Sequence, residues 1–174
     1  MRLPVFDGDV AGLMAMSRGE AGPSLLGIHV LVMDDEHDVR DMVAAALRDT
    51  GARVATAASA AEAMDAIDLE APDVLVGDLS MPEEDGYAFM RRLRLRPVAE
   101  GGQIPAIALT ALTEHRHHVA ALEAGYQIHL GKPINLKHLV LAAAALVPAE
   151  VRARSTLPLQ ANGGLPPQPP VRYF

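Results

Sequence analysis

Five polar residues each stand at the end of a short apolar run, although the runs lie far apart in the sequence. They are Asp34, Asp35, Asp78, Thr110 and Lys132. Three are carboxylic acids, one carries a hydroxyl and one carries an ammonium group. Carboxylates are ligands that Mg²⁺ prefers, and an ammonium and a hydroxyl group can hold the oxygens of a phosphoryl group. If folding brings the five together, they form a set suited to phosphoryl transfer.

Three carboxylates at one place repel one another, and burial adds to the cost of ionising them. A divalent cation that binds oxygen relieves this repulsion. Mg²⁺ fits, because it takes one or two carboxylates, keeps water molecules and bridges to a phosphoryl oxygen. Asp78 is then the candidate nucleophile, which would form an acyl phosphate. Taken singly, each residue is more often a helix cap, a loop acid or a surface charge, so only the joint pattern favours a site.

Runs of β-branched and aliphatic residues predict five strands. The strands are expected at 28–33, 53–57, 73–78, 104–110 and 126–130. Each is followed by a stretch in which apolar residues recur at helical spacing, so five helices alternate with them. Ser59 and Glu62 predict a capping box at the second helix, and Thr113 and Asn135 are expected to cap the fourth and fifth.

Strands and helices that alternate at this spacing predict a parallel sheet with helices on both faces, built from right-handed βαβ units. In such open α/β sheets, ligands bind outside the carboxyl ends of the strands. The five polar residues close the first, third, fourth and fifth strands. We therefore expect them to meet at one edge of the sheet.

The sequence around these residues resembles the response-regulator receiver domain over residues 28–147. The motifs that carry the resemblance are Val32-Met33-Asp34-Asp35, Asp78-Leu79-Ser80-Met81-Pro82 with Asp85-Gly86, Leu109-Thr110-Ala111, and Lys132-Pro133. The resemblance implies a flavodoxin-like (βα)5 doubly wound sheet with strand order 2-1-3-4-5. It also implies a cis peptide bond between Lys132 and Pro133.

The resemblance further implies a role for each site residue. Asp78 would accept a phosphoryl group from the phosphohistidine of a histidine kinase or a histidine phosphotransfer protein. Mg²⁺ would be held by Asp34, Asp35, Asp78 and the backbone carbonyl of Ser80. The phosphorylated form would then signal by binding an unknown downstream protein.

The phosphoryl oxygens would be bound by Thr110, Ala111 and Lys132, and the switch would consist of Thr110 and His129. The family usually has Tyr or Phe at the position of His129, and histidine can titrate near neutral pH. The alternative is a half-buried strand histidine with no switching role. Leu112 is apolar where many relatives are polar, and we expect it to shield an acyl phosphate from water.

Gly77, directly before the phosphoacceptor, replaces a larger apolar residue, so a small void or slack backbone is expected there. His115, His117 and His118 open the fourth helix. His115 and His118 stand at i, i+3 and could share a metal ion. A solvated, partly cationic face is the simpler interpretation, and docking of a partner is a third.

The composition excludes several classes of protein. A chain of 174 residues, half of them hydrophobic, is long enough for one domain of about 100–150 residues with tails. A net charge of -7 argues against a nucleic-acid partner. Without cysteine the chain has no disulfides, and no apolar run reaches the roughly 20 residues that span a bilayer. We expect a cytoplasmic protein without a membrane partner.

Three segments are expected: a linker or flexible lead-in over 1–27, the receiver domain over 28–147, and a Pro-rich disordered tail over 148–174. The domain is either a stand-alone switch or the terminal receiver of a hybrid histidine kinase. A Mg²⁺-dependent aspartyl-phosphate phosphatase is less favoured, because such enzymes need an acid two residues after the nucleophile, where this chain has Ser80. A scaffold with a vestigial site is also less favoured, because all five site residues are present. We therefore expect a switch and not an enzyme.

Overall fold

A parallel five-stranded sheet forms the centre of the protein. The computed structural model describes residues 23–111, 115–147 and 151. The strands are β1 (His29–Met33), β2 (Arg53–Ala57), β3 (Val74–Asp78), β4 (Ala106–Thr110) and β5 (Ile128–Gly131). They lie in the order β2-β1-β3-β4-β5, and every neighbouring pair is parallel. The predicted strand order 2-1-3-4-5 is therefore confirmed.

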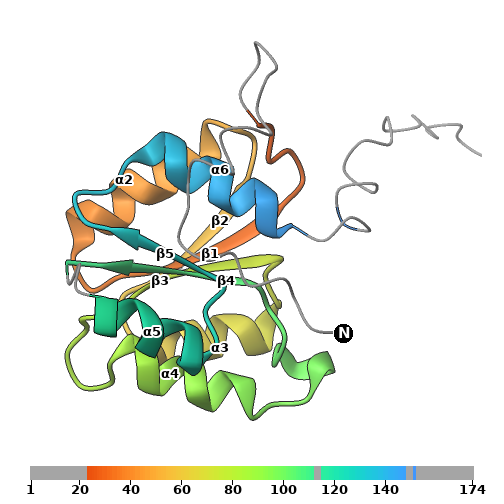
Figure 1. Ribbon diagram of the computed structural model, residues 1–174. Helices are drawn as coiled ribbons and strands as arrows, with labels where there is room; N and C mark the ends of the chain where they lie inside the picture. Colours follow the sequence, from red (N-terminus) through yellow and green to blue (C-terminus); the bar gives the residue numbers. More distant parts are fainter. Residues whose placement is uncertain (1–22, 112–114, 148–150, 152–174) are drawn as a thin grey trace, which may run out of the picture.

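Helices cover both faces of the sheet (Figure 1). They are α2 (His37–Arg48), α3 (Ala60–Leu69), α4 (Gly86–Arg94), α5 (His115–Ala124) and α6 (Leu136–Leu146), with a short 3-10 turn η1 (Val98–Glu100) after α4. Helices α2 and α6 pack on one face, and α3, α4 and α5 pack on the other. Side chains from the two faces of β1, β3 and β4 enter separate apolar cores, which explains why these strands are apolar runs without strict alternation.

Three helices begin at residues whose side chains accept hydrogen bonds from the first turn. Asn135 caps α6, Asp85 caps α4 and Ser59 caps α3. The expected capping box differs in one contact, because the Glu62 carboxylate accepts a hydrogen bond from the N–H of Ala58 (2.8 Å) instead of Ser59. The expected cap Thr113 and the shielding residue Leu112 lie outside the described residues.

The strands that follow α4 and α5 begin later than the sequence indicates. β4 begins at Ala106 and β5 at Ile128, so Tyr126 and Gln127 belong to the connection between α5 and β5. Gln127 links this connection to the start of β4, since its side chain accepts a hydrogen bond from Ala106 N (2.7 Å) and donates one to Gly125 O (2.7 Å).

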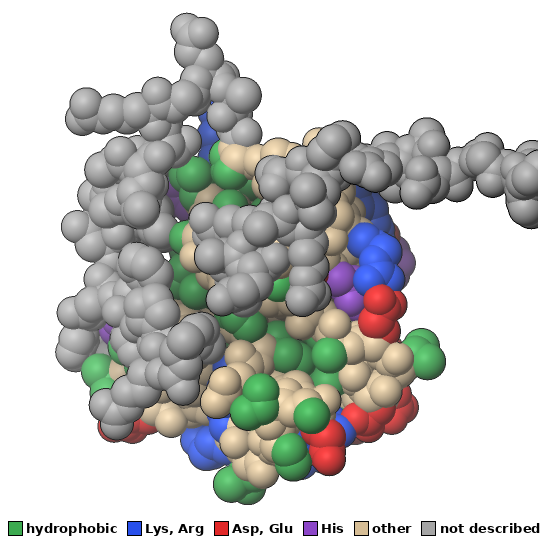
Figure 2. Space-filling view, turned by 90° about the vertical axis from the view of Figure 1, so that its right-hand side faces the viewer, with side chains coloured by type: hydrophobic (Ala, Val, Ile, Leu, Met, Phe, Trp, Pro, Cys, Tyr) green, Lys and Arg blue, Asp and Glu red, His purple; other side chains and the backbone are tan. Residues whose placement is uncertain are grey.

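Residues just before position 28, the expected start of the domain, also pack on the sheet. Leu25 is 1% exposed, and its N–H donates to the Thr50 carbonyl (2.9 Å). The described helices include none that is long and apolar enough to cross a membrane. Figure 2 looks onto the amino-terminal edge of the sheet, where the described basic side chains lie in separate places among hydrophobic and acidic ones.

Candidate functional site

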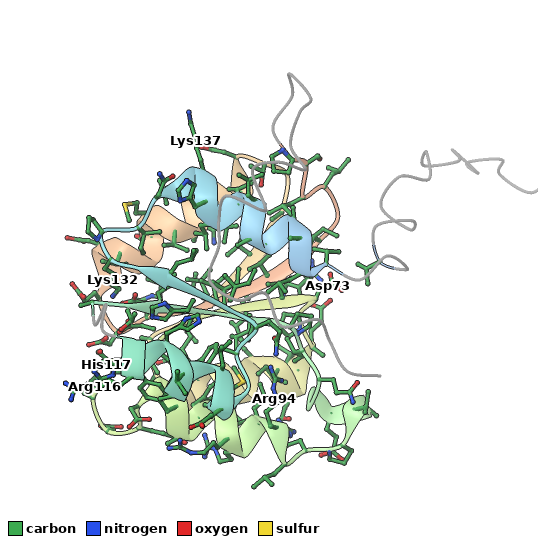
Figure 3. All side chains as sticks on the ribbon, viewed as in Figure 1. Asp73, Arg94, Arg116, His117, Lys132 and Lys137 are labelled. Carbon is green, nitrogen blue, oxygen red and sulfur yellow. The ribbon has the colours of Figure 1, made fainter. Side chains whose placement is uncertain are left out.

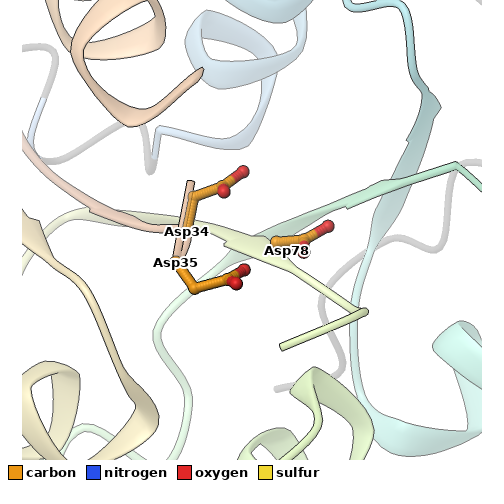
Figure 4. Close-up of side chains that lie close together, drawn as sticks. All are labelled: Asp34, Asp35 and Asp78. Atoms are coloured by element: carbon orange, nitrogen blue, oxygen red, sulfur yellow. The ribbon is translucent and has the colours of Figure 1, made fainter. Parts of the chain in front are cut away.

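Three carboxylates converge at the carboxyl edge of the sheet. Asp34 and Asp35 follow β1 and Asp78 ends β3, and one carboxylate oxygen of each lies within 4.8 Å of the others (Figure 4). Asp34 is fully buried and Asp78 is 2% exposed, whereas Asp35 is exposed. Within the described part of the chain, this is the one group of three acidic or histidine residues spaced to hold a metal ion.

The backbone that follows each strand holds these acids in place. The Asp34 carboxylate accepts a hydrogen bond from the N–H of Glu36 (2.9 Å), and the Asp34 carbonyl accepts one from the Arg40 guanidinium (2.7 Å). At the end of β3, the Asp78 carboxylate accepts a hydrogen bond from the N–H of Ser80 (3.2 Å). The carboxylates of Asp34 and Asp78 are therefore each oriented by a hydrogen bond from the N–H two residues later, and this bond also stabilises the turn.

Lys132 completes the edge from β5. Its Nζ lies 3.1 Å from Asp34 Oδ2, 3.3 Å from Asp78 Oδ1 and 3.5 Å from Glu36 Oε1. Figure 3 shows Lys132 at the opposite edge from Asp73, which precedes β3. The peptide bond between Lys132 and Pro133 is cis, as the resemblance implied. One ammonium group therefore sits against two buried carboxylates.

Burial and charge act on Asp78 and Lys132 in opposite directions. Burial raises the pKa of Asp78; the Lys132 charge lowers it and the Asp34 charge raises it, and the net shift is upward. Burial lowers the pKa of Lys132, but the hydrogen bond to Asp34 and the charges of Asp78 and Asp34 outweigh burial and raise it. Lys132 therefore stays cationic, and a further cation would favour the ionised form of Asp78.

The donor set fits Mg²⁺. Oδ1 of Asp78 is buried and makes no hydrogen bond within the described residues, although Lys132 Nζ is near. A buried carboxylate oxygen without a hydrogen bond is unfavourable, and a hard cation such as Mg²⁺ would satisfy it. Asp34 and Asp35 offer further oxygens, and Ser80 lies in the adjoining loop with its carbonyl as the expected fourth ligand.

Thr110 and Ala111 lie at the end of β4, beside the Asp78 strand. Thr110 is fully buried and ends β4, in which Leu109 is paired with Asp78. The Thr110 carbonyl accepts a hydrogen bond from the N–H of Lys132 (2.6 Å), so β4 and β5 present these two residues together. Ala111 is exposed at the start of the following loop.

His129 occupies the expected switch position on β5. Its ring is half-buried and packs edge-to-face on His118 of α5, with ring centroids 5.3 Å apart. The Nε2 atom is buried and has no hydrogen-bond partner within the described residues. Burial lowers the pKa of His129, and the nearby His118 and His117 lower it further. The fold therefore favours a neutral imidazole at this position.

We expect His129→Phe to make the stability of the protein less sensitive to acid. Because the folded-state pKa of His129 lies below its unfolded value, the neutral ring stabilises the fold above pH about 6.5, and this advantage is lost as the pH falls through the folded pKa. Thermal unfolding midpoints between pH 8 and pH 5 measure the effect. The wild type should lose more stability than the variant, and parallel curves would contradict the prediction.

The other histidines of α5 face different neighbours. His117 Nδ1 lies 3.4 Å from the Tyr87 hydroxyl of α4, and Figure 3 shows His117 and Arg116 toward the same edge as Lys132. The alternative of a metal ion shared by His115 and His118 falls outside the described residues, because these do not include the side chain of His115. His117 instead forms part of the packing between α4 and α5.

The residue that sequence reasoning missed is Tyr126. The expected void beside Gly77 is absent, because a Cβ at Gly77 would lie 3.0 Å from Met33 Cε and 3.2 Å from the Tyr126 hydroxyl. The expectation of a void at this point was therefore wrong. The sequence holds one indication of this contact. A glycine stands inside a buried strand, and an aromatic residue directly follows Gly125, which ends a helix.

The fold and the site together define a class of protein: a doubly wound α/β domain with an acidic cation site and a paired lysine at its carboxyl edge. A family model, the response regulator receiver domain, matches residues 30–144, and the chain belongs to this family. Receiver domains are two-component signalling switches that bind Mg²⁺ at an acidic site, and they are not classical enzymes.

Three comparisons place the chain within the family. The response regulator MprA of Mycobacterium tuberculosis is 35% identical over 122 residues, which cover 70% of this chain and 51% of MprA, so the match spans about half of that relative. The receiver domain of a signal transduction histidine kinase from Syntrophus aciditrophicus is 30% identical, with a TM-score of 0.64 over 70% of this chain and 90% of that one. The receiver domain of a Pseudomonas aeruginosa sensor histidine kinase, described with magnesium in its active-site cleft, is 27% identical, with a TM-score of 0.63 over 70% and 98%.

Proposed function

We propose that this chain is a phosphoacceptor switch in which Asp78 receives a phosphoryl group from the phosphohistidine of a histidine kinase or a histidine phosphotransfer protein. The observation that carries the proposal is the buried Asp78 carboxylate, set between Asp34 and Lys132 at the carboxyl edge of the sheet. A carboxylate in such a place is a suitable nucleophile for an acyl phosphate. The proposal places this reaction in the cytoplasm and its output in the binding of a downstream protein.

The transfer exchanges one bond to phosphorus for another. An oxygen of Asp78 bonds to phosphorus while the bond from phosphorus to the donor's imidazole nitrogen breaks, and its electron pair returns to that nitrogen, which takes up a proton. Lys132, 3.3 Å from Asp78 Oδ1, balances charge on the phosphoryl oxygens. Asp34, Asp35, Asp78 and the Ser80 carbonyl would hold Mg²⁺, which would supply positive charge to balance the phosphoryl oxygens.

The switch would connect β4 to α5. The Thr110 hydroxyl and the Ala111 N–H are the proposed donors to the phosphoryl oxygens, and Thr110 would turn toward the phosphorylated Asp78. The His129 strand is paired with β4, and the His129 ring packs on His118 of α5. A shift of Thr110 would then change the face made by α5 and β5, on which a partner binds.

The alternative proposal is the terminal receiver of a hybrid histidine kinase. Two of the similar solved structures are described as receiver domains of histidine kinases, which favours this alternative. Transfer assays separate the two. A terminal receiver should pass its phosphoryl group on to a histidine phosphotransfer protein, whereas a stand-alone switch should keep it until hydrolysis.

Labelling by acetyl phosphate tests the function. In Mg²⁺ we expect the mass of one phosphoryl group on each chain, mapped by peptide analysis to Asp78, and in EDTA we expect none. Equal labelling in EDTA, or labelling at another residue, would contradict the proposal. Continuous hydrolysis of acetyl phosphate without a stable adduct would instead favour the phosphatase alternative.

A further inference from the structure

Tyr126 is a large buried residue to which the proposed function gives no role. It is 1% exposed and belongs to the core that includes Met33 and Phe89, on the face of the sheet covered by α3, α4 and α5. Its backbone N–H donates to the Ala121 carbonyl (3.1 Å), which anchors it to the end of α5. Its ring therefore extends from α5 into the core beneath the acidic site.

The ring of Tyr126 reaches the phosphoacceptor strand because Gly77 has no side chain. A Cβ at Gly77 would lie 3.2 Å from the Tyr126 hydroxyl, 3.8 Å from Tyr126 Cε1 and 3.0 Å from Met33 Cε. The first and third of these distances are shorter than ordinary contacts, so a larger residue would displace the ring or the Met33 side chain. The small residue at 77 and the large residue at 126 therefore depend on each other.

The Tyr126 hydroxyl lies next to the loop that follows Asp78. It donates a hydrogen bond to the Gly86 carbonyl (3.0 Å), and both groups are buried. The Gly86 N–H in turn donates to the Leu79 carbonyl (3.1 Å), which closes the loop 79–86. A Cβ at Gly86 would lie 2.4 Å from the backbone carbonyl oxygen of Asp78, so the Gly86 backbone packs against the backbone of Asp78.

We propose that Tyr126 is a positioning residue for Mg²⁺ binding and phosphoryl transfer. Seated in the space that Gly77 leaves, its hydroxyl holds the Gly86 carbonyl, and Gly86 fixes the loop that carries the Ser80 carbonyl beside Asp78. The inference rests on the proposed function, because it assigns this loop a metal ligand. Tyr126 touches neither the cation nor the phosphoryl group, so it acts only through the loop.

The chemistry of the hydroxyl suits this role. Burial raises the pKa of Tyr126, so the phenol stays protonated and remains a donor to the Gly86 carbonyl. Without the hydroxyl, the Gly86 carbonyl loses this donor, and the junction between the loop and the start of α4 is held by one contact fewer. Loss of the hydroxyl should therefore reduce the fraction of molecules whose loop is arranged to bind the cation.

The decisive variant is Tyr126→Phe, which removes one oxygen and keeps the ring. Since a buried hydrogen bond contributes about 1 kcal/mol, we expect Mg²⁺ to bind about fivefold more weakly by calorimetric titration. The Mg²⁺ concentration that gives half-maximal labelling by acetyl phosphate should rise by the same factor, while the rate at saturating Mg²⁺ changes less. Tyr87→Phe is the matched control, because it removes a hydroxyl that lies 3.4 Å from His117 Nδ1.

A second variant separates positioning from packing. In Gly77→Ala/Tyr126→Phe the new methyl group would lie 3.2 Å from the position of the lost hydroxyl, so it fills part of that space once the end of the flexible Met33 side chain, 3.0 Å away, has shifted. We expect this variant to be at least as stable to heat as Tyr126→Phe and to keep its weakened Mg²⁺ binding. Recovery of wild-type Mg²⁺ affinity in the double variant would show that Tyr126 acts by packing alone, and it would overturn the inference.

The same measurements distinguish failure of this inference from failure of the proposed function. If the wild type neither binds Mg²⁺ nor labels at Asp78, the proposed function is wrong, and the inference is overturned with it. If the wild type labels and Tyr126→Phe shows an unchanged Mg²⁺ dependence, the inference alone is wrong. Weaker Mg²⁺ binding in Tyr126→Phe, with Tyr87→Phe unchanged, supports it.

Discussion

Asparagine in place of Asp78 is expected to abolish labelling by acetyl phosphate and, without Mg²⁺, to stabilise the protein. Labelling is lost because the amide cannot form the acyl phosphate. The fold is stabilised because burial raises the pKa of Asp78, although Lys132 acts against that rise, and Asp34 adds to it. The ionised carboxylate is thus held in a place that disfavours its charge.

The stability difference between the wild type and Asp78→Asn should change with pH in a defined direction. The folded-state pKa of Asp78 lies above the unfolded value of about 3.9. The destabilisation caused by the buried charge is therefore absent below that pH, and it is complete once the pH has risen past the folded-state pKa. The wild type should therefore lose stability relative to Asp78→Asn as the pH rises from about 4 to 7. We therefore expect the variant to be the more stable of the two at pH 7 in EDTA.

In Mg²⁺ the wild type should be more stable than Asp78→Asn, which is the opposite of the order in EDTA. Mg²⁺ binds the native site and stabilises the wild type by mass action, whereas the variant has lost one carboxylate ligand and gains less. Thermal unfolding in EDTA and in Mg²⁺ measures both effects. Asp65→Asn, an exposed change on α3, is the matched control and should label as the wild type does. Destabilisation by Asp78→Asn in EDTA, or labelling of this variant at position 78, would contradict the prediction.

The position of the acidic edge could be predicted from the sequence because it depends on local signals and one rule of topology. Asp78 and Lys132 follow apolar runs, and the carboxyl ends of parallel strands meet at one edge. Once the runs are assigned as strands, convergence requires no knowledge of side-chain packing. The structure adds the ion pairs, including the approach of Lys132 to Glu36, which strand patterns do not specify.

The features that the sequence did not reveal involve packing between distant segments. A glycine at 77 indicates that volume is missing from a strand, but it does not say which side chain fills the space. The sequence predicts a fifth strand that begins at Tyr126, yet the Tyr126 N–H bonds to the end of α5 and its ring fills that space. Glu62 likewise bonds Ala58, one residue before the predicted partner.

Methionine in place of Lys132 is expected to disrupt both stability and chemistry. Asp34 is fully buried and Asp78 nearly so, and Lys132 is the ammonium group that lies within 3.3 Å of a carboxylate oxygen of each. Removal of one partner from a buried ion pair leaves an uncompensated charge, which costs about 3–5 kcal/mol. Methionine retains the apolar stem of lysine, so this loss reports the charge and not the packing.

Mg²⁺ should restore the stability of Lys132→Met but not its chemistry. The cation can balance Asp34 and Asp78, so the unfolding midpoint should rise more with Mg²⁺ in the variant than in the wild type. The phosphoryl oxygens still lack their ammonium donor, and loss of such a group slows reactions by about 10²–10³. Labelling rates at saturating Mg²⁺ measure this effect.

Lys137→Met is the matched control for Lys132→Met. It replaces the second of the two lysines in the sequence, which is exposed at the start of α6 and lies apart from Lys132 in Figure 3. We expect this control to unfold and label as the wild type does. A Lys132→Met protein that labels at the wild-type rate would remove the lysine from the phosphoryl chemistry. It would leave Lys132 only the task of balancing two buried carboxylates when no metal ion is bound.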